Sequence, residues 1–209
     1  HPVMCTDGRA DSSSTHPKAA ALNYLMQSYV KKGLPGMAVL VHDANGTWTG
    51  SAGKADIGRN IDFEPCHVSK AASITKLFVG TLTMKLVEEG VLQLDQKIST
   101  WIPRKYLKNI KNANEATLRQ LLNHSSGIYD VIKDEGFYLA VLNNPNKNWT
   151  PDELLEFVYN KDAVFSCGSK FGYSNTNTLL VGMVIDYATG RPHDELLHEK
   201  ILDPLGLRN

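Results

Sequence analysis

The amino-acid sequence predicts a mixed α/β fold of the α+β type, in which helical segments outnumber strands. Two observations indicate this class: one apolar β-rich run that doubles back at an Asn-Gly turn, and several segments whose apolar residues recur at helical spacing. A third observation is a shortage of strands, because a two-stranded hairpin is only marginally stable by itself. We therefore expect further strands of the same sheet to lie outside residues 1–209.

The first predicted elements are one helix and one hairpin. Pro17 opens the helical segment and Gly33 closes it. Gly36–His42 and Thr47–Ala52 are predicted as the two strands of a β-hairpin around the Asn-Gly turn. Within the first strand, Met37–Val41 is almost entirely apolar, which favours cover on both of its faces.

The remaining predicted elements are helices. The strongest pattern is Ser73–Glu89, which ends at Gly90 and carries most of its apolar residues on one broad face. A helix starting at Thr150 has an N-cap residue, a proline in the first turn and acids near the positive end of the helix dipole. Further helices are expected at Thr117–Asn123, Asn175–Ala188 and His193–Leu202.

Residues 1–16 are predicted to form a disordered leader, because they are polar, serine-rich and without apolar periodicity. The chain begins with His1 rather than methionine, so we expect a processed or trimmed N-terminus. Cys5 in this leader has two interpretations, which stay open. It is either a free thiol in a flexible tail or part of a lipid-bearing N-terminal region of an exported bacterial protein.

Composition excludes several classes of function. The chain has 22 basic and 22 acidic residues and a formal net charge of zero, which argues against a protein that coats nucleic acid or an anionic membrane. The longest apolar runs are too short to span a bilayer. We therefore expect no nucleic-acid partner, and membrane contact only through a lipid on the leader.

Several catalytic patterns are missing from the sequence. It contains no Gly-x-Ser-x-Gly elbow, no His-Glu-x-x-His, no Cys-x-x-Cys, no phosphate-binding loop and no dinucleotide fingerprint. Its three cysteines are too few and too scattered for a zinc site. We expect neither a metal nor an organic cofactor.

The tetrad Ser-x-x-Lys occurs three times, and context singles out Ser73 and Lys76 from the pairs Ser28/Lys31 and Ser51/Lys54. Ser73 opens the long apolar helix, where its hydroxyl would lie in the positive field of the helix dipole. Lys76 follows nearly one turn later on the same face, so it can reach Ser73 and act as the base that a weak hydroxyl nucleophile needs. The alternative is an N-cap serine beside a solvated lysine, and the local sequence favours neither interpretation.

A second polar cluster contains Tyr173 and Asn175, just before a later helix. Extended residues two apart face the same way, so the phenol and the carboxamide are predicted to line one wall of a cleft. The alternative makes Tyr173 a core aromatic and Asn175 a helix N-cap, and Asn175 can fill both roles.

The order of these motifs resembles the serine β-lactamase and penicillin-binding protein superfamily, in its branch of class C β-lactamases, D-alanyl-D-alanine carboxypeptidases and esterases. Ala72-Ser-Ile-Thr-Lys76 precedes Tyr173-Ser-Asn175 as in that family. Residues roughly 20–207 show the similarity in consistent order, with further matching segments at Glu88–Asp95, Leu121–Gly127 and Asp203–Leu207.

The resemblance implies an antiparallel sheet flanked by helices plus a helical subdomain, with residues 17–209 as the N-terminal portion of such a domain. It implies that Ser73 is the acylated nucleophile and that Lys76 deprotonates it. Tyr173 would act as or with the general base, and Asn175 would hold the acyl-side amide of the substrate. His124 and Ser125 match a segment that we interpret as structural support.

The sequence departs from the family pattern in two ways. The third motif, Lys-Thr-Gly or His-x-Gly on a later strand, has no counterpart after Asn175, so a C-terminal segment of the same fold would have to supply it, in the same or a separate chain. Cys167 stands where many relatives have proline. Cys66 and Cys167 both approach the predicted site, so a disulfide between them is one expectation in an oxidising compartment.

These observations predict a serine hydrolase that acts through an acyl-serine intermediate on D-alanyl peptides, β-lactams or carboxylic esters. We favour a cell-wall peptidase or esterase, exported to the periplasm or cell envelope of a bacterium. The alternative is a non-catalytic penicillin-binding, peptidoglycan-binding or sensor protein on the same scaffold. The joint presence of Ser73, Lys76, Tyr173 and Asn175 argues against that alternative, because a protein that only binds needs no proton relay.

Overall fold

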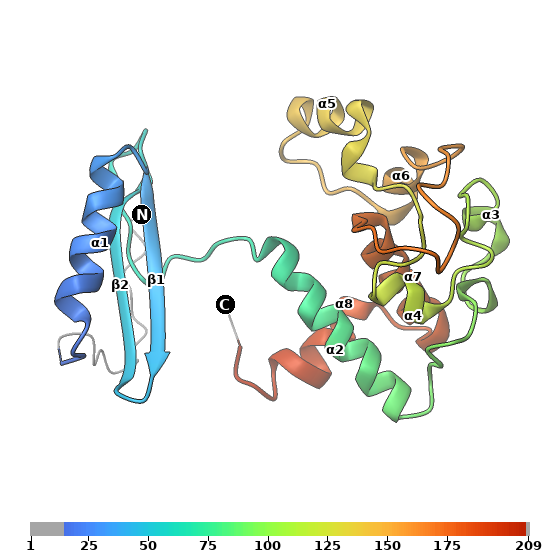
Figure 1. The fold of residues 1–209 in the computed structure, drawn as a ribbon, viewed down its shortest axis with the longest axis horizontal. Coiled ribbons are helices and arrows are strands. Elements are labelled where there is room, and N and C mark those ends of the chain that lie inside the picture. Colours follow the sequence, from blue (N-terminus) through green and yellow to red (C-terminus); the bar gives the residue numbers. More distant parts are fainter. Residues whose placement is uncertain (1–14, 208–209) are drawn as a thin grey trace. The chain divides into compact units, whose positions relative to one another are not determined.

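The structure is a computed structural model that describes residues 15–207. The chain divides into two compact units, His1–Lys70 and Ala71–Asn209 (Figure 1). The predicted leader falls mostly outside the described residues, and so does Cys5 with its two interpretations.

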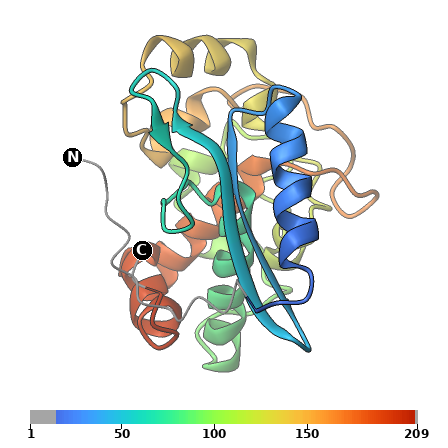
Figure 2. The same ribbon diagram turned by 90° about the vertical axis from the view of Figure 1, so that its left-hand side faces the viewer.

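The first unit is a helix packed on a small antiparallel sheet, which confirms the predicted helix and hairpin. Its elements are α1 (Ala19–Lys31), β1 (Gly36–Asp43), β2 (Gly46–Asp56) and β3 (Ile61–Asp62), with the strands in the order β1-β2-β3. Figure 2 shows α1 running alongside the two long strands. Met26 of α1 and Trp48 and Ala52 of β2 are buried between the helix and the sheet. The short strand β3 was not predicted, because two residues are too few to show an alternating pattern.

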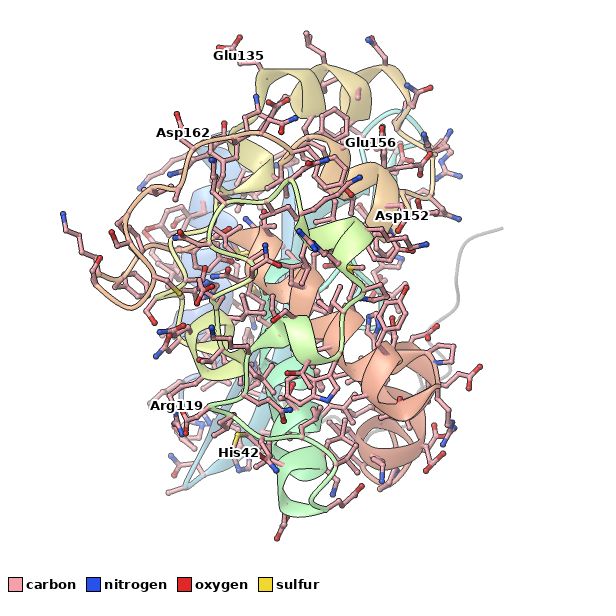
Figure 3. All side chains as sticks on the ribbon, turned by 90° about the vertical axis from the view of Figure 1, so that its right-hand side faces the viewer. His42, Arg119, Glu135, Asp152, Glu156 and Asp162 are labelled. Carbon is pink, nitrogen blue, oxygen red and sulfur yellow. The ribbon has the colours of Figure 1, made fainter. Side chains whose placement is uncertain are left out.

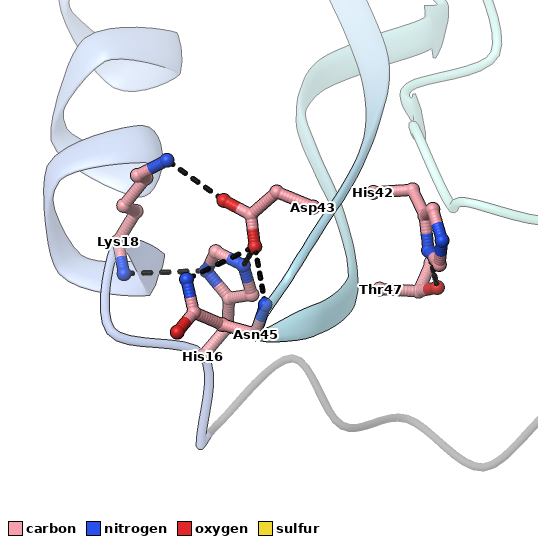
Figure 4. A network of polar contacts seen from close by, with 6 residues as sticks. All are labelled: His16, Lys18, His42, Asp43, Asn45 and Thr47. Atoms are coloured by element: carbon pink, nitrogen blue, oxygen red, sulfur yellow. Dashed lines mark hydrogen bonds and ion pairs between the residues drawn. The ribbon is translucent and has the colours of Figure 1, made fainter.

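The turn end of the hairpin is tied to the start of α1 through Asp43 (Figure 4). Its carboxylate accepts a hydrogen bond of 2.7 Å from Lys18 Nζ and one of 2.8 Å from the backbone N–H of Asn45, and it lies 3.2 Å from His16 Nε2. These partners, with Lys18 the strongest, hold the pKa of Asp43 well below its usual range. His16 is buried by this contact, so the prediction that the leader is disordered is wrong at its last residue.

The second unit is helical. Its longer elements are α2 (Thr75–Glu88), α5 (Glu135–Asn143) and α7 (Asn175–Thr189), and its shorter ones are η2 (Ala72–Ile74), η3 (Ile98–Thr100), α3 (Arg104–Leu107), α4 (Leu118–Leu122), η4 (Val131–Lys133), α6 (Pro151–Glu156), α8 (His193–Leu197) and η5 (His198–Leu202). Helix α7 is the centre of this unit, because it contacts α2, α4, α6 and α8. Its residues Leu180, Val184 and Ile185 are fully buried in the core that these helices share.

Local signals in the sequence explain several of the helix ends. Thr117 and Thr150 form capping boxes with Gln120 and Glu153 at the starts of α4 and α6. Gly190 ends α7 in the left-handed conformation. Near these ends, Arg119 of α4 (Figure 3) donates two hydrogen bonds, of 2.6 and 2.8 Å, to Asp95.

Two predictions for this unit need correction, and one helix was not predicted. The helix expected over His193–Leu202 is α8 followed by one π-helical turn. The helix that was not predicted is α5, whose middle residues are all apolar and show no helical alternation, with Tyr138, Leu139 and Leu142 exposed. The apolar face expected for α2 is buried only in its later turns. Ile74 and Leu77, at the start of this segment, are exposed.

The predicted pairing of Cys66 with Cys167 is wrong. Cys66 is disulfide-bonded, whereas Cys167 is a free thiol. The half-buried Cys167 sulfur lies 3.0 Å from Gln120 Oε1, to which it donates a hydrogen bond. Within residues 15–207, no helix combines the length and the apolar character needed to cross a bilayer.

Candidate active site

The sequence predicted that Ser73 opens the long helix, but it lies in the short turn η2, just before α2 begins at Thr75. The alternative interpretation of Ser73 as the N-cap is wrong, because Ile74 is the N-cap of α2. The residue before Ser73, Ala72, has a φ of +47°. This left-handed conformation costs a residue with a Cβ atom roughly 1–2 kcal/mol. Backbone strain of this kind is concentrated at functional sites, where the surrounding structure maintains it.

Three side chains that the sequence singled out meet at the Ser73 hydroxyl. Tyr173 Oη lies 3.0 Å from Ser73 Oγ, and Lys76 Nζ donates to the same oxygen at 3.3 Å. The ammonium group also lies 5.0 Å from the centre of the Tyr173 ring. The predicted proximity of Ser73, Lys76 and Tyr173 is therefore confirmed, although Tyr173 is distant from the other two in sequence.

Asn175 completes the cluster from the start of α7. Lys76 Nζ donates a 2.8 Å hydrogen bond to Asn175 Oδ1. The N-cap of α7 is Ser174, which is extended (φ −144°, ψ 126°). The interpretation of Asn175 as an N-cap is therefore wrong, because its side chain faces Lys76 while Ser174 begins the helix.

The position of Lys76 determines the acidity of Tyr173. The hydrogen bond from Lys76 lowers the pKa of the phenol most, and the bond to Ser73 lowers it further, against a smaller opposing effect of burial. The phenolate form, which can take a proton from a hydroxyl, is therefore easier to reach than in a free tyrosine. Lys76 itself is half-buried, whereas Ser73 and Tyr173 are exposed to solvent.

Asp130 is a site residue that the sequence analysis missed. This residue is buried, with 3% of its surface exposed, and its carboxylate accepts hydrogen bonds from the backbone N–H (2.9 Å) and Nδ2 (3.2 Å) of Asn175. It also accepts from the backbone N–H of Ile132 at 3.4 Å. An aspartate directly before a helical turn carries no sequence signal that separates a support for Asn175 from an ordinary cap.

His124 supports the Tyr173 side of the cluster. Its ring lies 4.6 Å from the Tyr173 ring at an angle of 31°. Its Nδ1 accepts the backbone N–H of Ser174 at 3.3 Å and lies 3.2 Å from Asn177 Nδ2. Burial, followed by the charge of Lys76, lowers the pKa of His124, which favours the neutral ring that can accept at Nδ1.

The segment that carries His124 and Asp130 is held from its other side by Asn112. The Asn112 amide donates 2.8 Å hydrogen bonds to the carbonyl oxygens of Ser126 and Phe165. The carbonyl of Gly127 accepts from the N–H of Val164 at 2.8 Å. These bonds fix the backbone immediately before Asp130.

No group of three or more histidine, cysteine, aspartate or glutamate side chains in the described part of the chain is arranged to hold a metal ion. The arrangement that the structure does present is a hydroxyl in contact with a phenol and an amine, beside a carboxamide. This arrangement suits nucleophilic attack with proton transfer.

Comparison with known proteins identifies the family. The chain belongs to the Beta-lactamase family, whose sequence model matches residues 22–209. Among solved structures it is similar to a D-stereospecific amidohydrolase from Streptomyces sp., with 34% identity and a TM-score of 0.80, covering 90% of this chain and 55% of that one. The resemblance that the sequence motifs indicated is confirmed.

Two curated proteins are also similar. Protein flp of Staphylococcus aureus (strain MW2) is 27% identical over 198 residues, which cover 93% of this chain and 38% of that protein. The D-alanyl-D-alanine-carboxypeptidase/endopeptidase AmpH of Escherichia coli (strain K12) is 26% identical over 214 residues, covering 99% of this chain and 54% of that protein. The chain thus spans between 38% and 55% of the length of these three relatives.

Proposed function

We propose that the protein is a serine hydrolase that acts through an acyl-serine intermediate. In this proposal Ser73 is the nucleophile, Lys76 and Tyr173 transfer its proton, and Asn175 binds the substrate. The observation that carries the proposal is the Ser73 hydroxyl, which has both a phenol at 3.0 Å and an amine at 3.3 Å. A serine with a structural role alone does not need two titratable partners on one oxygen.

In acylation, the Tyr173 phenolate takes the proton of Ser73 as Oγ attacks the carbonyl carbon of the substrate. The ammonium of Lys76 stabilises the phenolate before this transfer. The negative charge that develops on the carbonyl oxygen requires hydrogen-bond donors, and by family resemblance the backbone N–H of Ser73 is one of them. As the tetrahedral intermediate collapses, Tyr173 gives the proton to the leaving group, and Ser73 is left as an ester.

In deacylation, the same groups act on water. Tyr173 is again a phenolate, because the leaving group has taken its proton. It accepts a proton from a water molecule while the water oxygen attacks the ester carbonyl. Collapse of the second intermediate breaks the bond to Ser73 Oγ. The proton held by Tyr173 returns to Ser73, which restores the starting state.

For the substrate, we favour amide or peptide bonds next to a D-configured residue over β-lactams and simple carboxylic esters. Support comes from the relatives, since one is named a D-stereospecific amidohydrolase and another a D-alanyl-D-alanine-carboxypeptidase/endopeptidase. We further propose an exported protein of a bacterial cell envelope. We also propose that a C-terminal segment of the same fold supplies the third motif. This segment would correspond to the part of the relatives that the chain does not cover.

The nucleophile is tested by labelling the full-length protein with a fluorescent penicillin and a fluorophosphonate and mapping the adduct by mass spectrometry. The chain supplies matched controls in Ser28 and Ser51, which belong to the other two Ser-x-x-Lys tetrads. We expect Ser73→Ala to abolish labelling and Ser28→Ala and Ser51→Ala to leave it unchanged. An adduct on another residue, or undiminished labelling of Ser73→Ala, would overturn the assignment.

The substrate class is tested by steady-state rates on four kinds of substrate. The panel contains D-alanyl-D-alanine peptides and D-amino acid amides, their L-configured counterparts, nitrocefin and p-nitrophenyl esters. We expect the D-configured amides to have the highest kcat/KM. Labelling of Ser73 without turnover of any substrate would favour the non-catalytic binding protein.

A further inference from the structure

The carboxamide of Asn175 lies between two groups of opposite hydrogen-bonding character. The Lys76 ammonium can only donate, and it lies 2.8 Å from Asn175 Oδ1. The Asp130 carboxylate can only accept, and its two oxygens lie 3.2 and 3.4 Å from Asn175 Nδ2.

Only one of the two orientations of this amide satisfies both neighbours. With Oδ1 toward Lys76 and Nδ2 toward Asp130, both contacts are hydrogen bonds. The flipped orientation would place the NH2 group against an ammonium and the amide oxygen against a carboxylate, which are two repulsive contacts. The chemistry of the neighbours therefore determines the orientation of Asn175.

We propose that Asp130 is a positioning residue that locks the Asn175 carboxamide in this orientation for substrate binding. The inference rests on the proposed function, since it concerns the same site. An amide nitrogen carries two hydrogens. Asp130 occupies one of them, and the other is free to donate to the carbonyl oxygen of an amide on the acyl side of the substrate.

The burial of Asp130 makes this lock rigid. Only 3% of the residue is exposed, and the same oxygen, Oδ1, accepts both the Nδ2 group and the backbone N–H of Asn175. That N–H belongs to the first residue of α7, whose following turns are buried in the core. Asp130 therefore fixes the backbone and the side chain of Asn175 together.

The test compares two esters that differ only in an acyl-side amide: the p-nitrophenyl ester of N-acetyl-D-alanine and p-nitrophenyl propionate. We expect the wild-type full-length protein to prefer the first. In Asp130→Asn, the neighbouring group can donate as well as accept, so the hydrogen bond that holds Asn175 Nδ2 is weakened and Lys76 alone orients the amide. We expect this preference to fall roughly 3- to 10-fold, the effect of one lost hydrogen bond, while Ser73 is still labelled by a fluorophosphonate.

Asp134 provides the matched control. It also caps a helix, accepting the N–H of Phe137 at 3.0 Å, but its ion pair is with Lys161. Asp134→Asn should keep the wild-type preference between the two esters. If Asp130→Asn slows both esters equally and keeps the preference, Asp130 supports the fold alone and the inference is wrong.

A second variant covers the case in which Asp130→Asn fails to fold. The double substitution Asp130→Asn and Asn175→Asp exchanges donor and acceptor. The introduced carboxamide at position 130 donates to the introduced carboxylate at position 175, and this carboxylate still accepts from Lys76. We expect it to fold and to lack the preference, because the side chain of residue 175 then has no N–H to donate to the substrate. A double variant that folds and retains the preference overturns the inference, whereas a wild-type protein in which Ser73 is not labelled overturns the proposed function instead.

Discussion

Gly127 is the position at which one added methyl group should be most costly to the candidate site. Its φ is +69°, and a Cβ atom there would lie 2.1 Å from the carbonyl oxygen of Phe165 and 2.8 Å from Asn112 Nδ2. Neither atom is free to move, since Asn112 donates to the Phe165 carbonyl at 2.8 Å. The Gly127→Ala variant must therefore shift the backbone that leads to Asp130.

The magnitude follows from two contributions. The left-handed conformation costs a residue with a Cβ roughly 1–2 kcal/mol. Forcing an extra carbon into a packed region costs about 1–3 kcal/mol more. We expect Gly127→Ala to lower the free energy of unfolding by about 2–5 kcal/mol.

Gly90 provides a control that separates the two contributions. Its φ is +75°, but no heavy atom lies within 4 Å of the position of an added Cβ. Gly90→Ala should therefore show only the conformational cost, about 1–2 kcal/mol. The measurement is chemical denaturation of the full-length protein and both variants, followed by circular dichroism. If the two variants lose the same stability within about 0.5 kcal/mol, the packing argument is refuted.

Three further predictions concern titratable groups. Lys76→Met removes the main influence that lowers the Tyr173 pKa, so the acid limb of the kcat/KM profile should move to higher pH; a limb that stays in place contradicts the role of Tyr173 as base. The pKa of His124 is lowered in the folded state. As the pH falls below about 6.5, the unfolded chain therefore binds more protons at this histidine than the folded protein does, and the free energy of unfolding decreases. Denaturation curves should show that His124→Gln removes this loss, up to about 1.4 kcal/mol per pH unit, and an unchanged slope would exclude His124 as its source. Burial, followed by the charge of Glu115, raises the pKa of Cys167, so iodoacetamide should alkylate it more slowly in the native than in the unfolded protein; equal rates by mass spectrometry would contradict this.

Features that depend on neighbouring residues along the chain were predictable from the sequence. Thr117 and Thr150 cap helices because their side chains reach backbone groups three residues away. The Asn-Gly turn reverses the chain, so that β2 pairs antiparallel with β1 in the expected hairpin. Lys76 reaches Ser73 because residues three apart are neighbours on a helical path, even though Ser73 lies in the turn before α2.

Features that depend on contacts between distant segments were decided by the tertiary structure. The buried carboxylate of Asp130 meets Asn175 only because the segment before η4 packs against the start of α7, and no local pattern encodes that approach. The thiol of Cys167 faces Gln120 and is free, where the sequence allowed a disulfide. Hydrophobic periodicity indicates that a helix has an apolar face, but the burial of each residue on that face depends on which other segments pack against it. Within the second unit, Ile74 and Leu77 are not part of the shared core, although both belong to the apolar pattern of α2.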